Sequence, residues 1–179
     1  MQTQIIAHCQ KWIEKFVIGL NFCPFAHFVF ENDKIDYQVL FAAKRKMIVT
    51  EILAICQKLN QNSEKETALL ILADGWADFQ IYLNLVEIVN NQLVAHRLNR
   101  QFQIATFHPD YVFEGKNYTD AANFTNRSPY PILHVLRQSS VTWARKTHEN
   151  INDIPNQNIK TADKVGYAEL QNDWENLFD

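Results

Sequence analysis

TALLILADG, at residues 67–75, is a run of apolar residues that ends in the turn-forming pair Asp-Gly. A short apolar run closed by a turn is typical of a strand buried on both faces. FQIATF, at residues 102–107, has the same character, and apolar residues at helical spacing fill residues 79–93 between the two runs. A strand, a long helix and a second strand in this order predict a βαβ unit and a largely parallel sheet. The sequence therefore predicts an α/β fold.

Helical patterns also lie on the amino-terminal side of these strands. Residues 5–17 and 48–59 carry apolar residues at helical spacing, and each pattern places a cysteine, Cys9 or Cys56, on its apolar face. We expect both cysteines in the core. Residues 27–43 form two extended runs around a turn at residues 32–34, which predicts a hairpin or a bent strand pair.

Residues 108–128 show no periodicity and are longer than an ordinary connection, which is typical of a functional or disordered loop. Helical spacing then predicts two helices, at residues 131–148 and 158–178. The whole chain, residues 1–179, is expected to form a single α/β domain, in which helices pack on a mostly parallel or mixed small sheet. The order of the strands stays open.

Composition limits the class of protein. The chain has 179 residues, of which 47% are hydrophobic and 21% charged, enough for one sizeable core. The formal net charge is −3, and the basic residues 44–46 are typical of an exposed helix start rather than of a nucleic-acid surface. We therefore expect no nucleic-acid partner.

Cysteine usage and hydropathy indicate the compartment. The three cysteines form no CxxC pair and no regular spacing, so a disulfide framework is not expected and a reducing compartment is. Polar and charged residues interrupt the first dozen residues, and the longest apolar run, residues 68–73, is far too short to span a bilayer. We expect a soluble, cytoplasmic protein without a membrane partner, and the oligomeric state stays open.

GLNFCPFA, at residues 19–26, places a third cysteine in a different setting. Gly19 fits the left-handed position that follows a helix end. Pro24 pushes Cys23 toward an extended conformation, so this thiol lies on constrained backbone just after a helix. Cys23 is either a small packing residue or a reactive one.

Two strand ends carry polar residues. Asp74 follows the first buried strand, and HPDY, from His108, follows the second. In a parallel sheet these ends share one edge, where open α/β folds bind ligands. His108 and Asp110, two residues apart, point the same way if the backbone stays extended. The structural alternative is that His108 caps its strand through backbone hydrogen bonds.

TNRSPYPILHVLR, at residues 125–137, suggests an anion site. Ser128 followed by Pro129 resembles a helix cap with proline at the first helical position, so free backbone N–H groups would converge with Arg127. In the predicted helix, the side chains of Tyr130, His134 and Arg137 form one stripe. The structural alternative is that Arg127 ties down the loop by binding carbonyl groups.

The stretches GLNFCPFA, FHPDYVFEG and TNRSPYPILHVLR together resemble the motifs of an uncharacterised bacterial family of unknown function. The resemblance covers essentially the whole chain and implies a single-domain cytosolic protein, but no reaction. Its motif positions are Asn21, Cys23, Pro24, His108, Pro109, Asn126, Arg127, Ser128, Pro129, Tyr130 and His134.

The first functional hypothesis is a cysteine-dependent hydrolase or transferase that acts on an anionic small molecule. Cys23 would be the nucleophile, His108 the acid or base and Asp110 the group that orients it. The anion-binding residues would be Asn21, Asn126, Arg127, Ser128, Tyr130, His134 and Arg137.

Two alternatives stay open. The same residues fit a non-catalytic anion-binding, ligand-binding or regulatory module. A third hypothesis takes Cys23 as a haem ligand, or His108, Asp110 and His134 as ligands of a divalent metal. Because the chain has no HxxxH pair, we expect neither a metal nor another cofactor.

Overall fold

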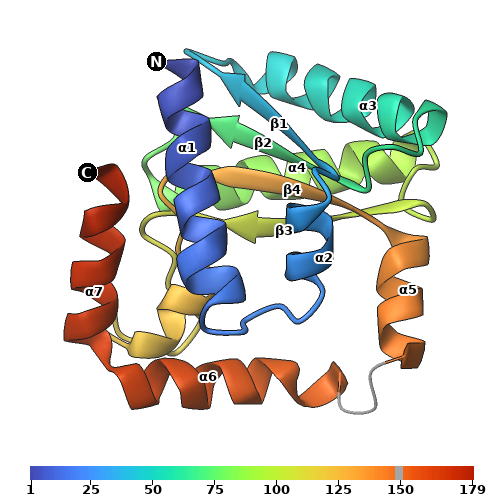
Figure 1. The fold of residues 1–179 in the computed structure, drawn as a ribbon. Helices are drawn as coiled ribbons and strands as arrows, with labels where there is room; N and C mark the ends of the chain where they lie inside the picture. Colours follow the sequence, from blue (N-terminus) through green and yellow to red (C-terminus); the bar gives the residue numbers. More distant parts are fainter. Residues whose placement is uncertain (148–150) are drawn as a thin grey trace.

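The computed structural model describes residues 1–147 and 151–179 (Figure 1). A four-stranded sheet forms its centre, and the strands lie in the order β1-β2-β4-β3. The strands are β1 (Ile35–Leu40), β2 (Thr67–Leu72), β3 (Phe102–Phe107) and β4 (Ile132–Arg137). β1 pairs with β2 in parallel, and β4 runs antiparallel to both of its neighbours. The predicted single α/β domain is confirmed, and its sheet is mixed. The expectation of a largely parallel sheet is wrong, because β4 lies between β2 and β3 and runs antiparallel to both.

Two long helices, α3 (Arg45–Gln61) and α4 (Phe79–Ala95), cover one face of the sheet. All six residues of β2 are buried, because this strand lies inside the sheet with helices on both faces. Both predicted strands and both predicted helices in this region are confirmed. Cys56 is buried on the apolar face of α3, as expected.

The other face packs against α1 (Gln2–Trp12), which continues as a π-helical turn at Ile13–Ile18 (Figure 1). Cys9 is buried there, as expected. The remaining elements are the helices α2 (Ala26–Glu31), α5 (Gln138–Thr147), α6 (Ile154–Val165) and α7 (Tyr167–Glu175), and the 3₁₀ turns η2 (Ala121–Thr125), η3 (Ile151–Asp153) and η4 (Asn176–Phe178). No helix in the described residues is long and apolar enough to cross a membrane.

The hairpin predicted for residues 27–43 is wrong in its first half. Residues 26–31 form α2, and only the second run is a strand, β1. Val29 and Phe30 pack against the core beneath α1, whereas Phe28 is exposed, so burial follows a helical rather than an alternating pattern. The turn between them is correct, since Asp33 adopts a left-handed conformation with φ 51°.

The two helices predicted near the carboxyl terminus also need correction. Residues 132–137 form β4, and only the following residues, up to Thr147, form a helix, α5. The predicted end at His148 lies outside the described residues. The second predicted helix is divided into α6 and α7 at Gly166. The φ of Gly166 is +88°, a value that does not occur in a regular helix.

Gly19 does not take the predicted left-handed conformation. Its φ is −61°, and the left-handed residue of this turn is Asn21, with φ 55°. The N–H of Gly19 donates to the carbonyl of Glu14 (2.9 Å), the spacing of a π-helix. A Cβ atom at Gly19 would collide with the carbonyl oxygen of Lys15. Glycine is therefore required here because the backbone of the preceding π-helical turn leaves no room for a Cβ atom.

Candidate functional site

The residues that follow β1, β2 and β3 lie together at one edge of the sheet. β1, β2 and β3 all run in the same direction, because β4 is antiparallel to both β2 and β3. Phe41, Asp74 and His108 follow the three strands, and Tyr130 lies just before β4. The expectation that Asp74 and His108 leave strands at one edge is confirmed.

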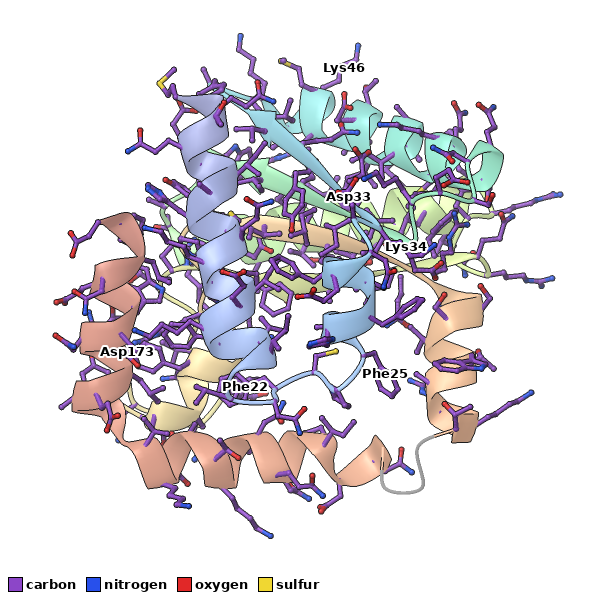
Figure 2. All side chains as sticks on the ribbon, in the orientation of Figure 1. Phe22, Phe25, Asp33, Lys34, Lys46 and Asp173 are labelled. Atoms are coloured by element: carbon purple, nitrogen blue, oxygen red, sulfur yellow. The ribbon has the colours of Figure 1, made fainter. Side chains whose placement is uncertain are left out.

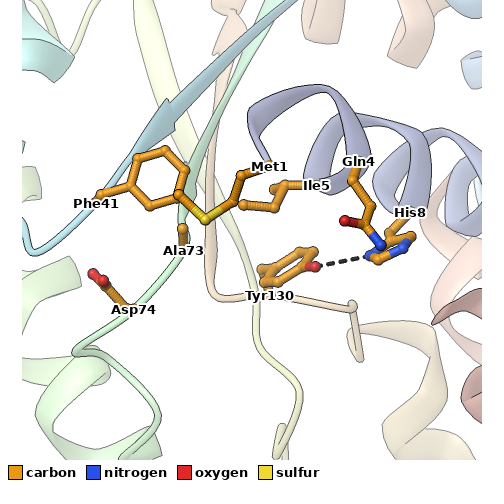
Figure 3. Close-up of a pocket in the computed structure, with 8 residues that line it drawn as sticks. All are labelled: Met1, Gln4, Ile5, His8, Phe41, Ala73, Asp74 and Tyr130. Carbon is orange, nitrogen blue, oxygen red and sulfur yellow. Dashed lines mark hydrogen bonds between the residues drawn. The ribbon is translucent and has the colours of Figure 1, made fainter.

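Two adjoining hollows lie at this edge. The larger, of about 330 Å³, is lined by Met1, Gln4, Ile5, His8, Phe41, Ala73, Asp74 and Tyr130 (Figure 3). The smaller, of about 200 Å³, is lined by residues 72–77, Pro109, Asp110 and residues 129–131. Ala73, Asp74 and Tyr130 line both, so the two hollows share one wall.

A histidine and a tyrosine form the polar side of the larger hollow. A hydrogen bond of 2.8 Å joins Nδ1 of His8 to the hydroxyl of Tyr130, and the two rings are nearly parallel. His8 is only 8% exposed, and burial, followed by the charge of Lys11, lowers its pKa. Its other ring nitrogen, Nε2, has no hydrogen-bond partner within the part of the chain that the structure describes. His8 therefore brings a neutral, polar ring with one unused nitrogen to the hollow.

Two carboxylates line the hollows from strand ends. Asp74 accepts a hydrogen bond from the backbone N–H of Ala42, which ties the end of β2 to the end of β1. Asp110 accepts from the hydroxyl of Tyr118 (2.9 Å). Figure 3 shows Asp74 and His8 on opposite sides of the larger hollow. Among the described residues that line either hollow there is no lysine and no arginine.

His108 is fully buried, and backbone groups use both of its ring nitrogens. Nε2–H donates to the carbonyl of Trp76 (3.0 Å), and Nδ1 accepts from the N–H of Asp110 (3.0 Å). The ring packs against Phe79 and Tyr82 of α4, and burial lowers its pKa although the carbonyl of Trp76 opposes this shift. This geometry matches the structural alternative, in which His108 caps its strand.

The predicted helix amino terminus at Ser128 is wrong, because Pro129 leads into strand β4. Arg127 is 2% exposed, and its guanidinium donates to the carbonyls of Tyr111 (3.3 Å) and Tyr118 (2.7 Å). It also lies over the rings of Tyr118 and Phe124, 4.3 and 4.8 Å from their centroids. The loop thus closes around Arg127, as in the structural alternative.

Neighbouring motif residues also bind backbone. The side-chain amide of Asn126 donates to the carbonyl of Thr106 (3.1 Å), and the hydroxyl of Ser128 donates to the carbonyl of Tyr130 (2.5 Å). These bonds fix the loop between the end of β3 and the start of β4.

Tyr130, His134 and Arg137 do not form one stripe. His134 and Arg137 point to opposite faces of β4, because side chains alternate along a strand. Nε2 of His134 bonds with the hydroxyl of Thr67 (2.7 Å), and burial lowers the pKa of His134 to about 4. Arg137 donates to the carbonyls of residues 59, 62 and 65, at 2.5, 3.1 and 3.1 Å. Its guanidinium is thus committed to the loop after α3.

Cys23 lies away from the sheet edge. Its neighbours Phe22 and Phe25 lie near the end of the first helical segment (Figure 2), and Phe22 belongs to the core beneath α1. Burial raises the pKa of the Cys23 thiol, although hydrogen bonds from the backbone N–H groups of Phe25 and Ala26 oppose this shift. No hydrogen bond among the described residues joins Cys23 to His108 or Arg127, and none of the three lines either hollow.

The sequence reasoning identified some residues of the edge and missed others. Asp110 and Tyr130 were candidates and line the smaller hollow, whereas Asn21 is exposed at a turn elsewhere. His8 was missed because it lies next to Cys9 in an apolar helical stripe, where a histidine resembles a core residue. Within residues 1–147 and 151–179, no three His, Cys, Asp or Glu side chains lie close enough to hold a metal ion.

Comparison with known proteins gives one match. A family model described as a protein of unknown function, DUF1415, matches residues 4–172. No curated protein and no solved structure matches the chain.

Proposed function

We propose that this chain, which belongs to the DUF1415 family of proteins of unknown function, binds a small molecule in the two joined hollows at the carboxyl edge of its sheet. The observation that carries the proposal is the position of these hollows, at the ends of three strands that point the same way. Open α/β folds bind ligands at this edge, because the loops there are free to vary while the strands hold them in place.

The size and the lining of the hollows support this role. The larger hollow, at about 330 Å³, falls at the lower end of the range for small-ligand pockets, and the smaller one extends it. Apolar walls such as Phe41 and Trp76 surround the polar groups of His8, Tyr130 and Asp74. Such a lining provides burial for a ligand and a few directional contacts.

The test uses a neutral probe, 3-phenylpropanol, which has an aromatic ring and one hydroxyl. Amide shifts in ¹H–¹⁵N spectra of the full chain should change at residues 72–77 and 129–131 as the probe is added. Ala73 lines both hollows, so Ala73→Phe should fill them and abolish these changes.

Ala168→Phe is the matched control, because Ala168 is exposed on α7 and the same side chain is added there. It should leave the shift changes intact. If the probe changes amides elsewhere, or if Ala73→Phe binds it as well as the control does, the edge is not the binding site.

A cysteine-dependent hydrolase or transferase acting on an anion is the second candidate. One observation favours it: the backbone N–H groups of Phe25 and Ala26 favour the thiolate form of Cys23, although burial has the larger effect and raises the pKa of the thiol. The test is alkylation by iodoacetamide, followed by mass spectrometry of each cysteine. A nucleophilic Cys23 would react at pH 7 far faster than free cysteine. A rate at or below that of free cysteine would refute this candidate. Burial raises the pKa of the thiol, so we expect this slow rate.

A further inference from the structure

We infer that two copies of this chain form a dimer by antiparallel pairing of their β3 strands, which joins the two sheets into one. The inference goes beyond the proposed small-molecule site, because it concerns the free side of β3 rather than the hollows at the strand ends. β3 is the last strand in the order β1-β2-β4-β3, so β4 occupies only one of its two sides (Figure 1).

Alternate residues of β3 direct their backbone groups away from β4. At the start of the ladder, the carbonyl of Gln101 accepts a hydrogen bond from the N–H of Gln138 (2.8 Å). Because hydrogen bonding alternates along an antiparallel strand, the odd-numbered residues of β3 bond to β4. The even-numbered residues, Phe102, Ile104 and Thr106, therefore direct their N–H and carbonyl groups to the free side of the strand.

One N–H and one carbonyl group on this side are used within the chain. The N–H of Phe102 donates to the carbonyl of Leu98 (2.9 Å), and the carbonyl of Thr106 accepts from the side-chain amide of Asn126 (3.1 Å). In the described part of the chain, no hydrogen bond uses the carbonyl of Phe102, the N–H of Thr106 or either group of Ile104. An unpaired edge of this kind is a template for another strand.

The unused groups are complementary to themselves about a two-fold axis at Ile104. When two β3 strands pair with Ile104 opposite Ile104, this residue exchanges two hydrogen bonds with its copy, and Phe102 lies opposite Thr106. The free N–H of Thr106 then donates to the free carbonyl of Phe102 in the other copy, twice by symmetry. The groups left over, the N–H of Phe102 and the carbonyl of Thr106, are those already bonded within each chain. Two-fold symmetry is the commonest symmetry of homo-oligomers.

Charges at the two ends of β3 favour the same arrangement. Arg97 and Arg100 precede the strand, Asp110 and Glu114 follow it, and all four side chains are exposed. None of them forms an ion pair within residues 1–147 and 151–179. Antiparallel pairing places the basic end of each strand beside the acidic end of the other, so the attraction between the copies occurs twice.

The helix beside β3 and the opposite edge of the sheet support the choice of β3. α4 packs against β3, and Glu87 is the only charged residue among the residues of α4, although Val94 is 58% exposed. In the joined sheet both α4 helices lie on the same face, where their lack of charge limits repulsion. The other edge strand, β1, carries Asp36, which pairs with Lys58 (2.8 Å), and a charge on an edge strand protects it from pairing.

Two measurements on the full chain test the inference. Sedimentation velocity at a series of protein concentrations detects the dimer, and hydrogen exchange of backbone amides, followed in ¹H–¹⁵N spectra, locates the contact. We expect a reversible dimer in which the amide hydrogens of Ile104 and Thr106 exchange slowly, because they are bonded to the other copy. Dilution to the monomer should make both amides exchange rapidly.

Thr106→Pro removes one donor from each copy without removing a hydrogen bond within the chain. It should raise the dissociation constant of the dimer at least about thirtyfold, since two hydrogen bonds are lost by symmetry. Thr106→Val is the matched control, because it keeps the N–H group and a β-branched side chain. It should form the dimer as well as the wild type does.

Arg100→Glu tests the charges and changes no residue of the strand, so it gives a result even if Thr106→Pro does not fold. At low salt it should weaken the dimer about tenfold, because the new carboxylate faces the acidic end of the other copy. Arg145→Glu is the control, since Arg145 is exposed on α5 and the change in net charge is the same. It should leave the dimer unchanged.

A monomer at every concentration would overturn the inference. A dimer in which the amide of Ile104 exchanges rapidly, or one that Arg100→Glu and Arg145→Glu weaken equally, would also overturn it, because the contact would then lie elsewhere. These results leave the small-molecule site untouched, which 3-phenylpropanol tests separately.

Discussion

Replacement of Arg127 tests whether this residue serves stability rather than ligand binding. The guanidinium is buried among backbone carbonyls and aromatic rings, and within the described residues no carboxylate pairs with it. It links residues 111 and 118 of the long loop to the start of β4. Arg127→Ala would leave these carbonyls without their donor and open a space between the rings of Tyr118 and Phe124.

The expected loss follows from these contacts. A hydrogen bond from a charged donor contributes about 1.5–3 kcal/mol, and a cation over an aromatic ring about 0.5–2 kcal/mol. Because the loop will partly relax, we expect Arg127→Ala to lower the free energy of unfolding by about 3–4 kcal/mol. Arg127→Lys should lower it by about 2 kcal/mol, since an ammonium group keeps the charge but cannot form the same planar fork.

Urea unfolding, followed by circular dichroism, measures both variants. Arg145→Ala is the matched control, because Arg145 is exposed on α5 and should lose less than about 0.5 kcal/mol. If Arg127→Ala does not fold, Arg127→Lys still provides the measurement. A loss no larger than that of Arg145→Ala, together with weaker binding of an anion such as phosphate, would refute the structural role.

Two further predictions concern the sheet and the first turn. Burial lowers the pKa of His134 to about 4 from its usual 6.5, so the unfolded chain binds this proton first and stability should fall as the pH decreases from about 6.5 to 4. Urea unfolding at pH 7.5 and pH 4.5 should show a loss about 2 kcal/mol larger in the wild type than in His134→Gln, and equal losses would contradict the assignment. Gly19→Ala should destabilise the protein by about 2 kcal/mol, because the added Cβ would collide with the carbonyl of Lys15, whereas Ser63→Ala at an exposed loop position should have little effect in the same assay.

The sequence correctly predicts the elements whose apolar pattern fits either a helix or a strand, but not both. The run at residues 67–72 is too short and too continuous for a helix, and α3 and α4 have long, regular stripes. The residues of β4 are ambiguous: Ile132, Val135 and Leu136 fit a helical stripe, and a strand buried on both faces also carries adjacent apolar residues. Only pairing with β2 and β3, which are distant in the sequence, decides between the two.

In the candidate site, too, some features could be predicted from the sequence and others depend on contacts between distant residues. The sheet edge could be predicted, because the carboxyl ends of parallel strands lie at the same edge of a sheet whatever the order of the strands. The partners of Cys23 and Arg127 could not, since they depend on how a long loop folds. His8 belongs to the edge only because β4 brings Tyr130 alongside α1, a contact across 122 positions of the chain.

The position of β4 in the sheet has a consequence for the nascent chain during translation. Of the four strands of the described sheet, β4 leaves the ribosome last, yet it lies between β2 and β3. Until it emerges, the nascent chain exposes one edge of β2, six apolar or β-branched residues without a charge, and β3 has no neighbour in the sheet. Such an edge is a template for pairing with other chains. At about 5–20 residues per second, translation leaves the edge of β2 unpaired for several seconds.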